Sequence, residues 1–432
     1  MARRRRGVLM VTLVGALAGL AFLTAGQPGA VDWRRLRAVA LHSDDWGLAG
    51  FVPSVDAWVG LDRAALSPGR FPDVYWNSTL EDSACVARLA AVLAGGRGRD
   101  GRPAVLQPNY VVSALDWTGG QWVRRDLPDF PETYRRPGLW QAMAEAMWAG
   151  VWYPEYHAAW HYDPQRRRQA VAAGGVALAA AERGVMLFPG SEAARELGPW
   201  RPTSELAAEL DAGLAVFTAA FGRGPGSIIA PDYTWDGRCE DLWESRGLTV
   251  IQAKREQRHP GLPPGAGGRV LKVLDRQWSR ARHRGRIYLE RNCRLEPAQA
   301  PDAGAVVAAC LDQTRRAWRC GEPAIVETHR VNFAHGDAAV AAAGREALAV
   351  YLAGLAGLGE TGPVFLVDAE IASLVRRGTS LVEAGDVLVA RNGTRSRRLA
   401  IPVAPAGPPK GTVALYLLEG GFQGLVAAGR SR

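Results

Sequence analysis

Cysteine is scarce in this chain of 432 residues, which has five. A small fold held together by several disulfides needs a much higher density of cysteine, so that class is excluded. The sequence also has no C-x-x-C pair, the spacing typical of cysteine-based metal sites. An odd number of cysteines leaves at least one thiol without a partner in the chain. We therefore expect any metal ligands to be histidine or carboxylate side chains.

The net positive charge of the chain is modest once the arginines at its amino terminus are left out. The formal net charge is +9, and Arg3–Arg6 supply four of these charges, which leaves +5 for the rest of the chain. This remainder is modest for the length, and no nucleic-acid-binding motif accompanies it. Apolar residues make up 48% of the chain, enough to build a core and to exclude disorder over most of it. We expect a globular protein without a nucleic-acid partner.

The amino terminus carries a targeting pattern. Arg3–Arg6 precede an apolar stretch, Val8–Ala25, and the uncharged run extends to Val31. A basic cluster before an apolar stretch is typical of an export signal. The stretch is longer than a usual signal peptide core and approaches the roughly 20 residues that span a bilayer. Residues 1–31 are therefore expected to be a cleaved signal peptide or a membrane anchor. Both alternatives place the rest of the chain in the cell envelope or outside the cell.

Short β-rich runs alternate with alanine-rich helical stretches through most of the chain. Strands separated by long helices are typical of βαβ units and a parallel sheet, and seven or eight units predict a closed or nearly closed barrel. The expected strands are Ala38–His42, Ala104–Val112, Val151–Tyr153, Val185–Phe188, Ser227–Ala230, Leu248–Gln252 and Ala324–Glu327. The expected helices include Gln165–Arg183, Thr203–Phe221 and Asp337–Leu358.

Near residue 379 the alternation of strands with long helices gives way to short strand-like runs and turn signals. Val387–Ala390 and Leu399–Val403 flank Asn392-Gly393, and Asn-Gly is the strongest two-residue turn signal, so a hairpin is expected there. Val413–Leu418 is expected to form another strand. We interpret residues 379–432 as a small β module that follows the α/β fold.

Five of the seven histidines fall in three segments that follow predicted strands. In a parallel barrel the carboxyl ends of the strands meet at one end, where the chemistry takes place. The three segments are therefore expected to come together. Their polar residues are His42, Asp44 and Asp45 at the end of the first strand, His157 and His161 after the third, and His329 and His335 after the seventh.

Two features of these segments point to a bound cation. Asp44 and Asp45 are adjacent carboxylates that repel each other, and a cation resolves this if one ligates it and the other remains as a base. The H-x-x-x-H spacing of His157 and His161 predicts two rings on one helical face. One carboxylate and two imidazoles suit zinc or another divalent transition metal. Such a metal polarises a carbonyl and lowers the pKa of its water.

At these residues the sequence resembles the polysaccharide deacetylase (NodB-homology) superfamily of carbohydrate esterases, as a divergent member. The first motif of that family ends in two aspartates, like Asp44 and Asp45. Its second motif is H-x-x-x-H, like His157 and His161, and its last has a histidine at the end of a late strand, like His329. The resemblance implies a distorted (β/α)7-type barrel over residues 36–376. It also implies metal-dependent removal of N- or O-acetyl groups from a cell-envelope or extracellular polysaccharide.

The resemblance also implies roles for the matched residues. Asp44 would be the general base, and His329 the general acid that protonates the leaving group. A backbone N–H near Tyr233, together with the metal, would stabilise the tetrahedral oxyanion. The cofactor would be a divalent metal, with zinc as the first choice. Its ligands would be Asp45, His157 and His161.

The third motif of the family has an arginine before a proline, and this chain has Pro231 without that arginine. We expect Arg238 or Arg330 to orient the base in its place. The candidates for the fourth motif, which contains Asp and Trp, are Asp275 and Trp278.

The loops after the strands are rich in tryptophan, and aromatic faces stack on sugar rings, so a polysaccharide substrate is expected. The expected substrate contacts are Trp46, Asn109, Tyr233, Trp235 and Arg330.

Two other functions fit parts of the pattern. A glycoside hydrolase on a similar barrel would use two carboxylates such as Asp44, Asp232 or Glu327, but it would leave H-x-x-x-H unexplained. A glycan-binding protein without turnover would fit the missing arginine. The sequence leaves the oligomeric state open.

Overall fold

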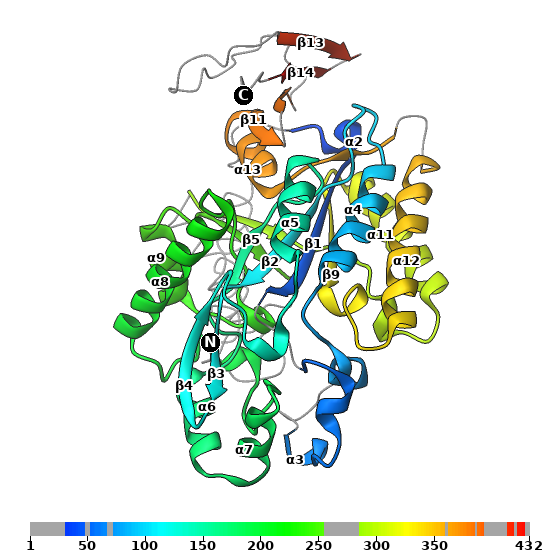
Figure 1. The fold of residues 1–432 in the computed structure, drawn as a ribbon. Helices are drawn as coiled ribbons and strands as arrows, with labels where there is room; N and C mark the ends of the chain where they lie inside the picture. The colour runs from blue at the N-terminus through cyan, green and yellow to red at the C-terminus, as the bar shows by residue number, and fades with distance from the viewer. Residues whose placement is uncertain are drawn as a thin grey trace, which may run out of the picture.

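The structure of the chain is a computed structural model (Figure 1). It describes residues 31–47, 52–66, 72–254, 285–358, 362–384, 387–392, 413–418 and 421–427. Residues 1–30 of the expected signal peptide or anchor lie outside the described residues, as do Asp275 and Trp278.

The central element is β1 (Ala38–Gly47), a strand that is buried at every position. It belongs to a six-stranded sheet in the order β5-β2-β1-β9-β8, in which β10 pairs with the start of β1 and all pairs are parallel. Parallel strands buried on both faces are expected where helices cover the sheet. The neighbours are β2 (Leu106–Val111), β5 (Glu155–Ala158), β8 (Cys293–Arg294), β9 (Ala324–His329) and β10 (Val364–Phe365).

A second parallel pair, β6 (Val250–Ala253) with β7 (Ile287–Glu290), lies beyond β5. It joins the sheet through single-residue bridges from Ile228 to Tyr156 and to Ile251. The α/β fold class is therefore confirmed. The described strands do not close into a ring, so the (β/α)7 barrel is not confirmed.

Three of the expected strands are not strands in the structure. Val185–Phe188 is buried but has no strand partner among the described residues, because the guanidinium of Arg167 binds the carbonyl oxygens of Met186 and Val185 at 2.8 and 3.4 Å. Val151–Tyr153 makes a single bridge, and the strand of this region is β5, which begins at Glu155. Ser227–Ala230 is reduced to one bridging residue.

The expected long helices are largely present. Thr203–Phe221 is α8, and α12 spans Ala338–Ala356. The predicted helix over Gln165–Arg183 is instead divided at Gly174, whose positive φ of 78° breaks the helix into α6 and α7. The remaining bounds are α2 (Trp33–Leu36), α3 (Arg63–Leu66), α4 (Ser83–Gly95), α5 (Leu139–Trp148), α6 (Pro164–Ala172), α7 (Gly175–Glu182), α9 (Gly237–Ser245), α11 (Ala303–Cys320) and α13 (Asp368–Arg377).

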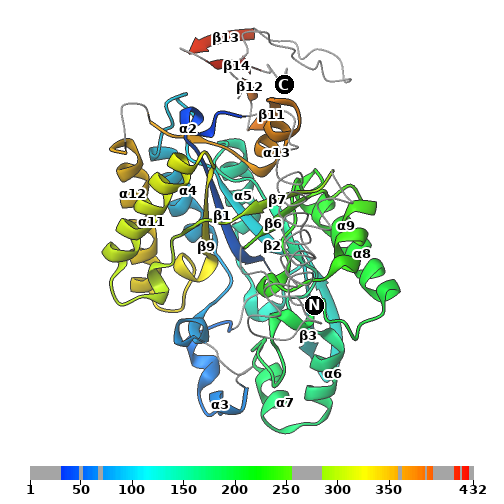
Figure 2. The same ribbon diagram turned by 180° about the vertical axis from the view of Figure 1, so that it is seen from behind.

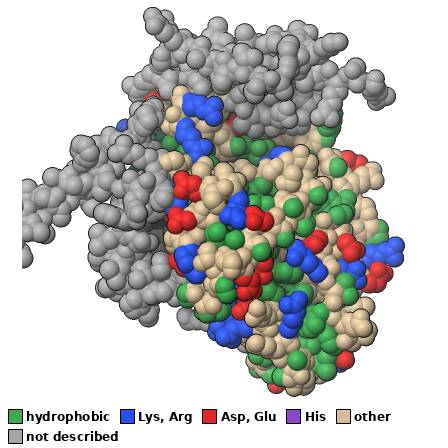
Figure 3. All heavy atoms as spheres, turned by 90° about the vertical axis from the view of Figure 1, so that its left-hand side faces the viewer, with side chains coloured by type: hydrophobic (Ala, Val, Ile, Leu, Met, Phe, Trp, Pro, Cys, Tyr) green, Lys and Arg blue, Asp and Glu red, His purple; other side chains and the backbone are tan. Residues whose placement is uncertain are grey.

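Figures 1 and 2 show α4, α11 and α12 along one flank of the sheet and α8 and α9 along the other. The face over α8 and α9 carries basic and acidic side chains side by side (Figure 3). An example is the ion pair of Arg246 with Asp211, at 2.7 Å. Short 3-10 turns connect the elements: η1 (Val55–Trp58), η2 (Asp73–Asn77), η3 (Glu132–Tyr134), η4 (Ala193–Arg195), η5 (Pro231–Tyr233), η6 (Pro297–Gln299) and η7 (Arg330–Asn332).

Among the described residues, α12 is the one helix with the length and apolar composition to cross a membrane. It is partly buried in the fold, and core helices of globular proteins pass the same test. Membrane attachment therefore stays a prediction that concerns the amino terminus.

A hairpin that the sequence analysis did not predict follows β2. Its strands, β3 (Ser113–Thr118) and β4 (Gln121–Asp126), meet at Gly119-Gly120, where both residues have positive φ. Two such residues give the tight turn whose twist matches paired strands. The hairpin projects past the carboxyl end of β2 (Figure 1).

The carboxyl-terminal strands form a separate antiparallel sheet in the order β11-β12-β14-β13. Val413–Leu418 is confirmed as the strand β13. The predicted hairpin is wrong, because β12 pairs with β11 and β14, while Leu399–Val403 lies outside the described residues. The other bounds are β11 (Thr379–Ala384), β12 (Val387–Asn392) and β14 (Gly421–Ala427).

Arg391 on β12 attaches this sheet to the rest of the fold. Its buried guanidinium contacts Glu370 at 2.8 Å and Asp100 at 2.7 Å. Asp100 precedes β2 and Glu370 lies in the first turn of α13, so the contact is at the amino ends of the parallel strands. In Figure 1 the sheet lies at the top, whereas β1 runs downward and ends near the middle of the molecule.

Candidate metal centre

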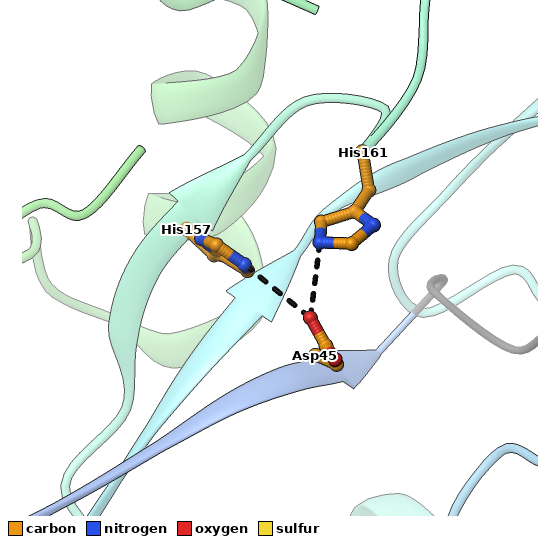
Figure 4. A group of neighbouring side chains, drawn as sticks. All are labelled: Asp45, His157 and His161. Atoms are coloured by element: carbon orange, nitrogen blue, oxygen red, sulfur yellow. Dashed lines mark ion pairs between the residues drawn. The ribbon is translucent and has the colours of Figure 1, made fainter. Parts of the chain in front are cut away.

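The side chains of Asp45, His157 and His161 converge at the carboxyl end of the sheet (Figure 4). Asp45 Oδ1 lies 3.4 Å from His157 Nε2 and 3.0 Å from His161 Nε2. The carboxylate comes from the end of β1, the first imidazole from β5 and the second from the turn after β5. Segments more than 100 residues apart thus place three ligand atoms around one point.

These distances suit a tetrahedral divalent cation. Nitrogen and oxygen atoms bound to zinc at about 2.0–2.2 Å with tetrahedral angles lie roughly 3.3–3.6 Å from one another. His157 Nδ1 is 3.1 Å from the carbonyl oxygen of Ile229, which leaves Nε2 directed toward Asp45. A backbone contact of this kind fixes the tautomer and ring orientation of a ligating histidine. The three residues therefore fit a zinc-type ion by donor type, spacing and orientation.

The predicted helical arrangement of the two histidines is wrong. His157 lies in β5, and His161 follows it in a turn with φ of 64°. Asp45 also has a positive φ, 69°, next to a register shift between β1 and β2. Left-handed backbone at residues other than glycine costs about 1–3 kcal/mol and is concentrated at functional sites. Two of the three candidate ligands are thus held in strained backbone, which orients them toward the third.

Glu196 holds the turn that presents His161. Its buried carboxylate accepts hydrogen bonds from the backbone N–H groups of Ala159 and Trp160, at 2.9 and 3.1 Å, and of His161 at 2.5 Å. These bonds compensate for the strain at His161. The sequence analysis did not identify Glu196, because it lies 35 residues along the chain in a region without a motif.

Asp45 is an anion in this environment. Burial raises the pKa of its carboxyl, but the charge of His161 and hydrogen bonds from His157 and His161 outweigh burial and hold the pKa well below its ordinary value. The ionised form is the one that binds a cation.

Asp44 is held by Arg291 and not by either arginine expected from the sequence. Arg291 Nη1 and Nη2 each donate to one carboxylate oxygen of Asp44, both at 2.7 Å. Arg238 instead pairs with Asp236, and Arg330 contacts Glu81 and Gly47. The reason is the position of Arg291 between β7, which pairs with β6, and β8, which pairs with β9. This position brings its side chain to the end of β1, which also pairs with β9.

All five N–H donors of Arg291 have acceptors. Besides the two bonds to Asp44, Nη1 donates to Tyr233 Oη at 2.6 Å, Nη2 to Gln252 Oε1 at 2.6 Å and Nε to His42 Nδ1 at 3.3 Å. His42 Nε2 in turn contacts Asp368 at 2.7 Å. Arginine has five donors in a fixed plane, so a filled set immobilises it and whatever it binds.

The same contacts determine the ionisation of Asp44. Burial raises the pKa of its carboxyl, but the charge and hydrogen bonds of Arg291, with the charges of His157 and His329, hold the pKa far below its ordinary value. Asn109 Nδ2 also donates to Oδ1 at 2.7 Å. Oδ1 therefore accepts two hydrogen bonds and Oδ2 accepts one from Arg291, which leaves Oδ2 the more available oxygen.

His329 lies opposite Asp44 in the register of β9 and β1. Its Nε2 is 3.8 Å from Asp44 Oδ2, and its Nδ1 is 2.5 Å from Glu296 Oε1. Burial lowers the pKa of His329, but Glu296, Asp45 and Asp44 raise it to about 10. His329 is therefore a cation at neutral pH, with its Nε2 proton directed to the same space as Asp44. Glu296, just after β8, was not identified from the sequence.

A second group of possible ligands comprises Glu296, Glu327 and His329. Here the charges are already compensated within the protein. Lys254 Nζ lies 2.5 Å from Glu327, and His329 uses Nδ1 for Glu296. The first group fits a cation better, because the two ring nitrogens of His157 and His161 both face Asp45 Oδ1.

Three predicted substrate contacts are core residues in the structure. Trp46 is fully buried, donates to Ser43 Oγ at 2.8 Å and packs edge-on against Trp152. Trp235 is fully buried and donates to Glu240. The buried Arg330 forms the ion pair described above. None of the three offers a surface to a substrate, so their assignment as contacts is corrected.

The other two predicted substrate contacts, Asn109 and Tyr233, bind other side chains of the site. Asn109 is fully buried and bonds to Asp44 and Gln252, so it supports the carboxylate. Tyr233 directs its hydroxyl to Glu327 at 2.9 Å. The backbone N–H groups of Tyr233 and Thr234 donate to the carbonyl oxygens of Ala230 and Pro231, each at 3.1 Å. The expected backbone donor near Tyr233 is thus already engaged.

No family model matches this chain, and no curated protein sequence matches it. Among solved structures, it is similar to the crystal structure of a "putative polysaccharide deacetylase from Mycobacterium smegmatis". The two chains are 14% identical, and the alignment covers 81% of this chain and 94% of that chain with a TM-score of 0.37. At this level the likeness gives no information on individual residues, and the candidate centre rests on its own geometry.

Proposed function

We propose that this protein is an exported, metal-dependent carbohydrate esterase that removes acetyl groups from a cell-envelope or extracellular polysaccharide. The observation that carries the proposal is the placement of Asp45 Oδ1 within 3.4 Å of His157 Nε2 and 3.0 Å of His161 Nε2, beside Asp44 and His329. Export is inferred from the amino-terminal pattern, and the polysaccharide from the motif resemblance.

The candidate centre holds the groups that hydrolysis of an acetyl group requires. A divalent cation bound by Asp45, His157 and His161 would polarise the acyl oxygen and lower the pKa of the attacking water. Asp44, ionised and held by Arg291, takes a proton from this water through Oδ2 as the water oxygen bonds to the acyl carbon. His329 then gives its proton to the amine or alcohol as the C–N or C–O bond breaks, and acetate is the second product.

The arrangement is less suited to glycoside hydrolysis. That reaction needs one carboxylic acid that carries a proton, next to a second carboxylate. The pKa of Asp44 is held low by Arg291, and Glu327 is ion-paired with Lys254 at 2.5 Å. Burial raises the pKa of Glu327, but the charges of His329, Arg291 and Lys254 lower it below its ordinary value. Neither carboxyl is a proton donor at neutral pH.

The test is metal analysis of the purified full-length protein combined with acetate release from acetylated glycans. We expect about one equivalent of a divalent metal per chain, and loss of both metal and activity in Asp45→Ala. The control is Asp211→Ala, which removes an exposed carboxylate on α8. Absence of bound metal, or an active Asp45→Ala variant, would overturn the proposal. Release of reducing ends would instead support a hydrolase, and glycan binding without acetate would support a binding protein.

A further inference from the structure

A buried histidine and a buried carboxylate, His42 and Asp368, lie in the interior of the fold near the base Asp44. His42 precedes Asp44 by two residues in β1, so both side chains leave the same face of the strand. Asp368 reaches His42 from the first turn of α13, 326 positions along the chain, and its Oδ1 is 2.7 Å from His42 Nε2. Both side chains are fully buried. Burial of such groups is costly unless they are hydrogen-bonded, so their other contacts indicate their role.

The contact with Arg291 determines where the ring of His42 carries its proton. Arg291 Nε lies 3.3 Å from His42 Nδ1, and an arginine N–H group can only donate. Nδ1 must therefore be the acceptor, and the ring proton is on Nε2. This N–H group donates to the carboxylate of Asp368 in a charge-assisted hydrogen bond. The hydrogen bonds thus run in one direction, from Arg291 through His42 to Asp368.

The carboxylate of Asp368 is held in place by two further side chains. Ser227 Oγ donates to Oδ2 at 2.7 Å, and Gln107 Nε2 donates to Oδ1 at 3.4 Å. Gln107 Oε1 also accepts from the backbone N–H of Asp368 at 2.7 Å. Burial raises the pKa of Asp368, but the interactions with His42 and Ser227 and the charge of Arg291 hold the pKa below its ordinary value. Asp368 is therefore an anion in a fixed position that accepts hydrogen bonds.

A second route joins Arg291 to the same carboxylate. Arg291 Nη2 donates to Gln252 Oε1 at 2.6 Å, and Gln252 Nε2 donates to Ser227 Oγ at 2.9 Å. Ser227 in turn donates to Asp368, so donors and acceptors agree along this route as they do through His42. A turn of the guanidinium would break hydrogen bonds in both routes. The orientation of Arg291 is therefore set from behind by residues that do not contact Asp44.

The base depends on this orientation, because Arg291 is the residue that holds it. Nη1 and Nη2 of Arg291 each donate to one oxygen of Asp44 at 2.7 Å, and Nε donates to His42. A guanidinium is planar, so a contact that fixes Nε also fixes the direction of the two bonds to Asp44.

We propose that His42 and Asp368 are positioning residues that act through Arg291 and keep Asp44 Oδ2 directed at the attacking water. The inference rests on the proposed esterase function and deepens it. Neither residue contacts the substrate or transfers a proton in this role. Together they fix the plane of the guanidinium, and the guanidinium fixes the base.

The first test is a pair of substitutions at His42. His42→Leu removes both ring nitrogens, whereas His42→Asn keeps an acceptor oxygen near the place of Nδ1 and cannot reach Asp368. We expect kcat to fall about 10–100-fold in His42→Leu, the range for losing a supporting contact around a reactive centre, and less in His42→Asn. KM and metal content should stay nearly unchanged, because no metal ligand is lost. An unchanged kcat in His42→Leu would overturn the proposal.

A double-mutant cycle separates action through Arg291 from a general structural role. Arg291→Lys has no Nε donor for His42, so adding His42→Leu to it should lower kcat little further. Equal fold losses with and without Arg291→Lys would overturn the proposal. If His42→Leu does not fold, Asp368→Asn, which keeps the shape and removes the charge, takes its place in the same cycle.

The matched control is Thr314→Val, which removes a buried hydroxyl on α11 that lies 2.8 Å from Tyr351 Oη. This variant should lower the melting temperature and leave kcat unchanged. It thereby shows the effect of a lost interior hydrogen bond that has no path to the base.

A further measurement does not depend on turnover. Nitrogen NMR of the purified full-length protein observes the ring of His42, which is assigned by its absence from His42→Asn. We expect a single ring proton, on Nε2, at neutral pH. A proton on Nδ1 would overturn the proposal, because Arg291 could not then donate to that atom. A wild-type protein that has the expected ring proton and binds metal but releases no acetyl group would overturn the proposed function instead.

Discussion

Arg291 and Asp44 form a two-pronged ion pair, with N···O distances of 2.7 Å for both bonds, although 247 positions separate them in the chain. The pair joins the end of β1 to the junction of β7 and β8. It places a carboxylate of very low pKa beside the candidate metal centre, with one oxygen toward His329. The orientation of Asp44 is thus determined by a side chain from a distant strand end and not by its own strand alone.

Replacing Arg291 by lysine should separate orientation from charge. A lysine keeps the positive charge but has three donors in place of a planar set of five, so Asp44 loses its fixed position. We expect kcat/KM for acetate release to fall about 10²-fold, the effect of a small misplacement of a reacting group. Metal content should persist. The control is Arg246→Lys at the exposed pair with Asp211, and equal activity of both variants would argue against the role of Arg291.

Removal of the metal should abolish activity without unfolding the protein. Glu196 holds the turn of His161 and the carbonyl oxygen of Ile229 holds the ring of His157, so the ligands keep their places when no cation is bound. We expect chelation to stop acetate release, zinc to restore it, and the far-ultraviolet circular dichroism to stay unchanged. The melting temperature should rise with zinc concentration, because a ligand of the native state stabilises it. Activity that resists exhaustive chelation would contradict the metal centre.

Glu296→Gln should move the alkaline limit of activity to lower pH. A general acid must be protonated, so activity is present below the pKa of His329 and is lost as the pH rises through it, at about 10. Glu296 is the strongest charged partner that raises this pKa, and the amide removes its charge while keeping the shape. The measurement is kcat/KM against pH, supported by an NMR titration of the His329 ring. An unshifted limit would show that Glu296 does not control the acid.

Glu196→Gln should weaken metal binding without removing a ligand. The amide has one carbonyl oxygen in place of two carboxylate oxygens, so the three backbone N–H groups of the His161 turn lose acceptors. Loss of such a supporting contact typically lowers metal affinity by about 10–100-fold. Competition with a chromogenic chelator measures the affinity. Glu132→Gln, which changes an exposed carboxylate in η3, is the control and should match wild type.

Arg391→Ala should affect stability and leave the chemistry unchanged. The substitution leaves Asp100 without the guanidinium of Arg391 and leaves Glu370 with Arg102 alone, at 3.3 Å. Removing one partner of a buried ion pair costs about 3–5 kcal/mol. Chemical denaturation measures the loss. Because Arg391 lies at the amino ends of the strands, kcat below the unfolding transition should equal that of wild type. A large fall in kcat with little loss of stability would show that the carboxyl-terminal sheet takes part in the site.

The sequence identified the three side chains that meet at the carboxyl end of the sheet, because strand ends of a parallel sheet converge whatever the exact register. It also predicted α8 and α12 and the strand β13, where apolar periodicity and turn signals are local. Their roles in metal binding and catalysis stay predictions.

The supporting residues could not be found in this way. Arg291, Glu296 and Glu196 carry no motif and reach the centre from elements that lie far away in the chain. Trp46 and Trp235 were wrongly predicted to contact a substrate. An aromatic residue near a strand end has the same local sequence pattern whether its ring faces the core or a substrate. Burial distinguishes the two cases, and burial is a property of the packed fold.

The amino-acid sequence by itself determined an α/β fold with a parallel sheet and the identity of the candidate ligands, and it predicts export from its amino-terminal pattern, since each depends on local spacing and composition. Only the tertiary structure decided that His161 lies in a strained turn, that Arg291 holds Asp44 and that Glu296 pairs with His329. These relationships depend on which distant side chains fill the space around a group, and such neighbours are set by packing and strand register.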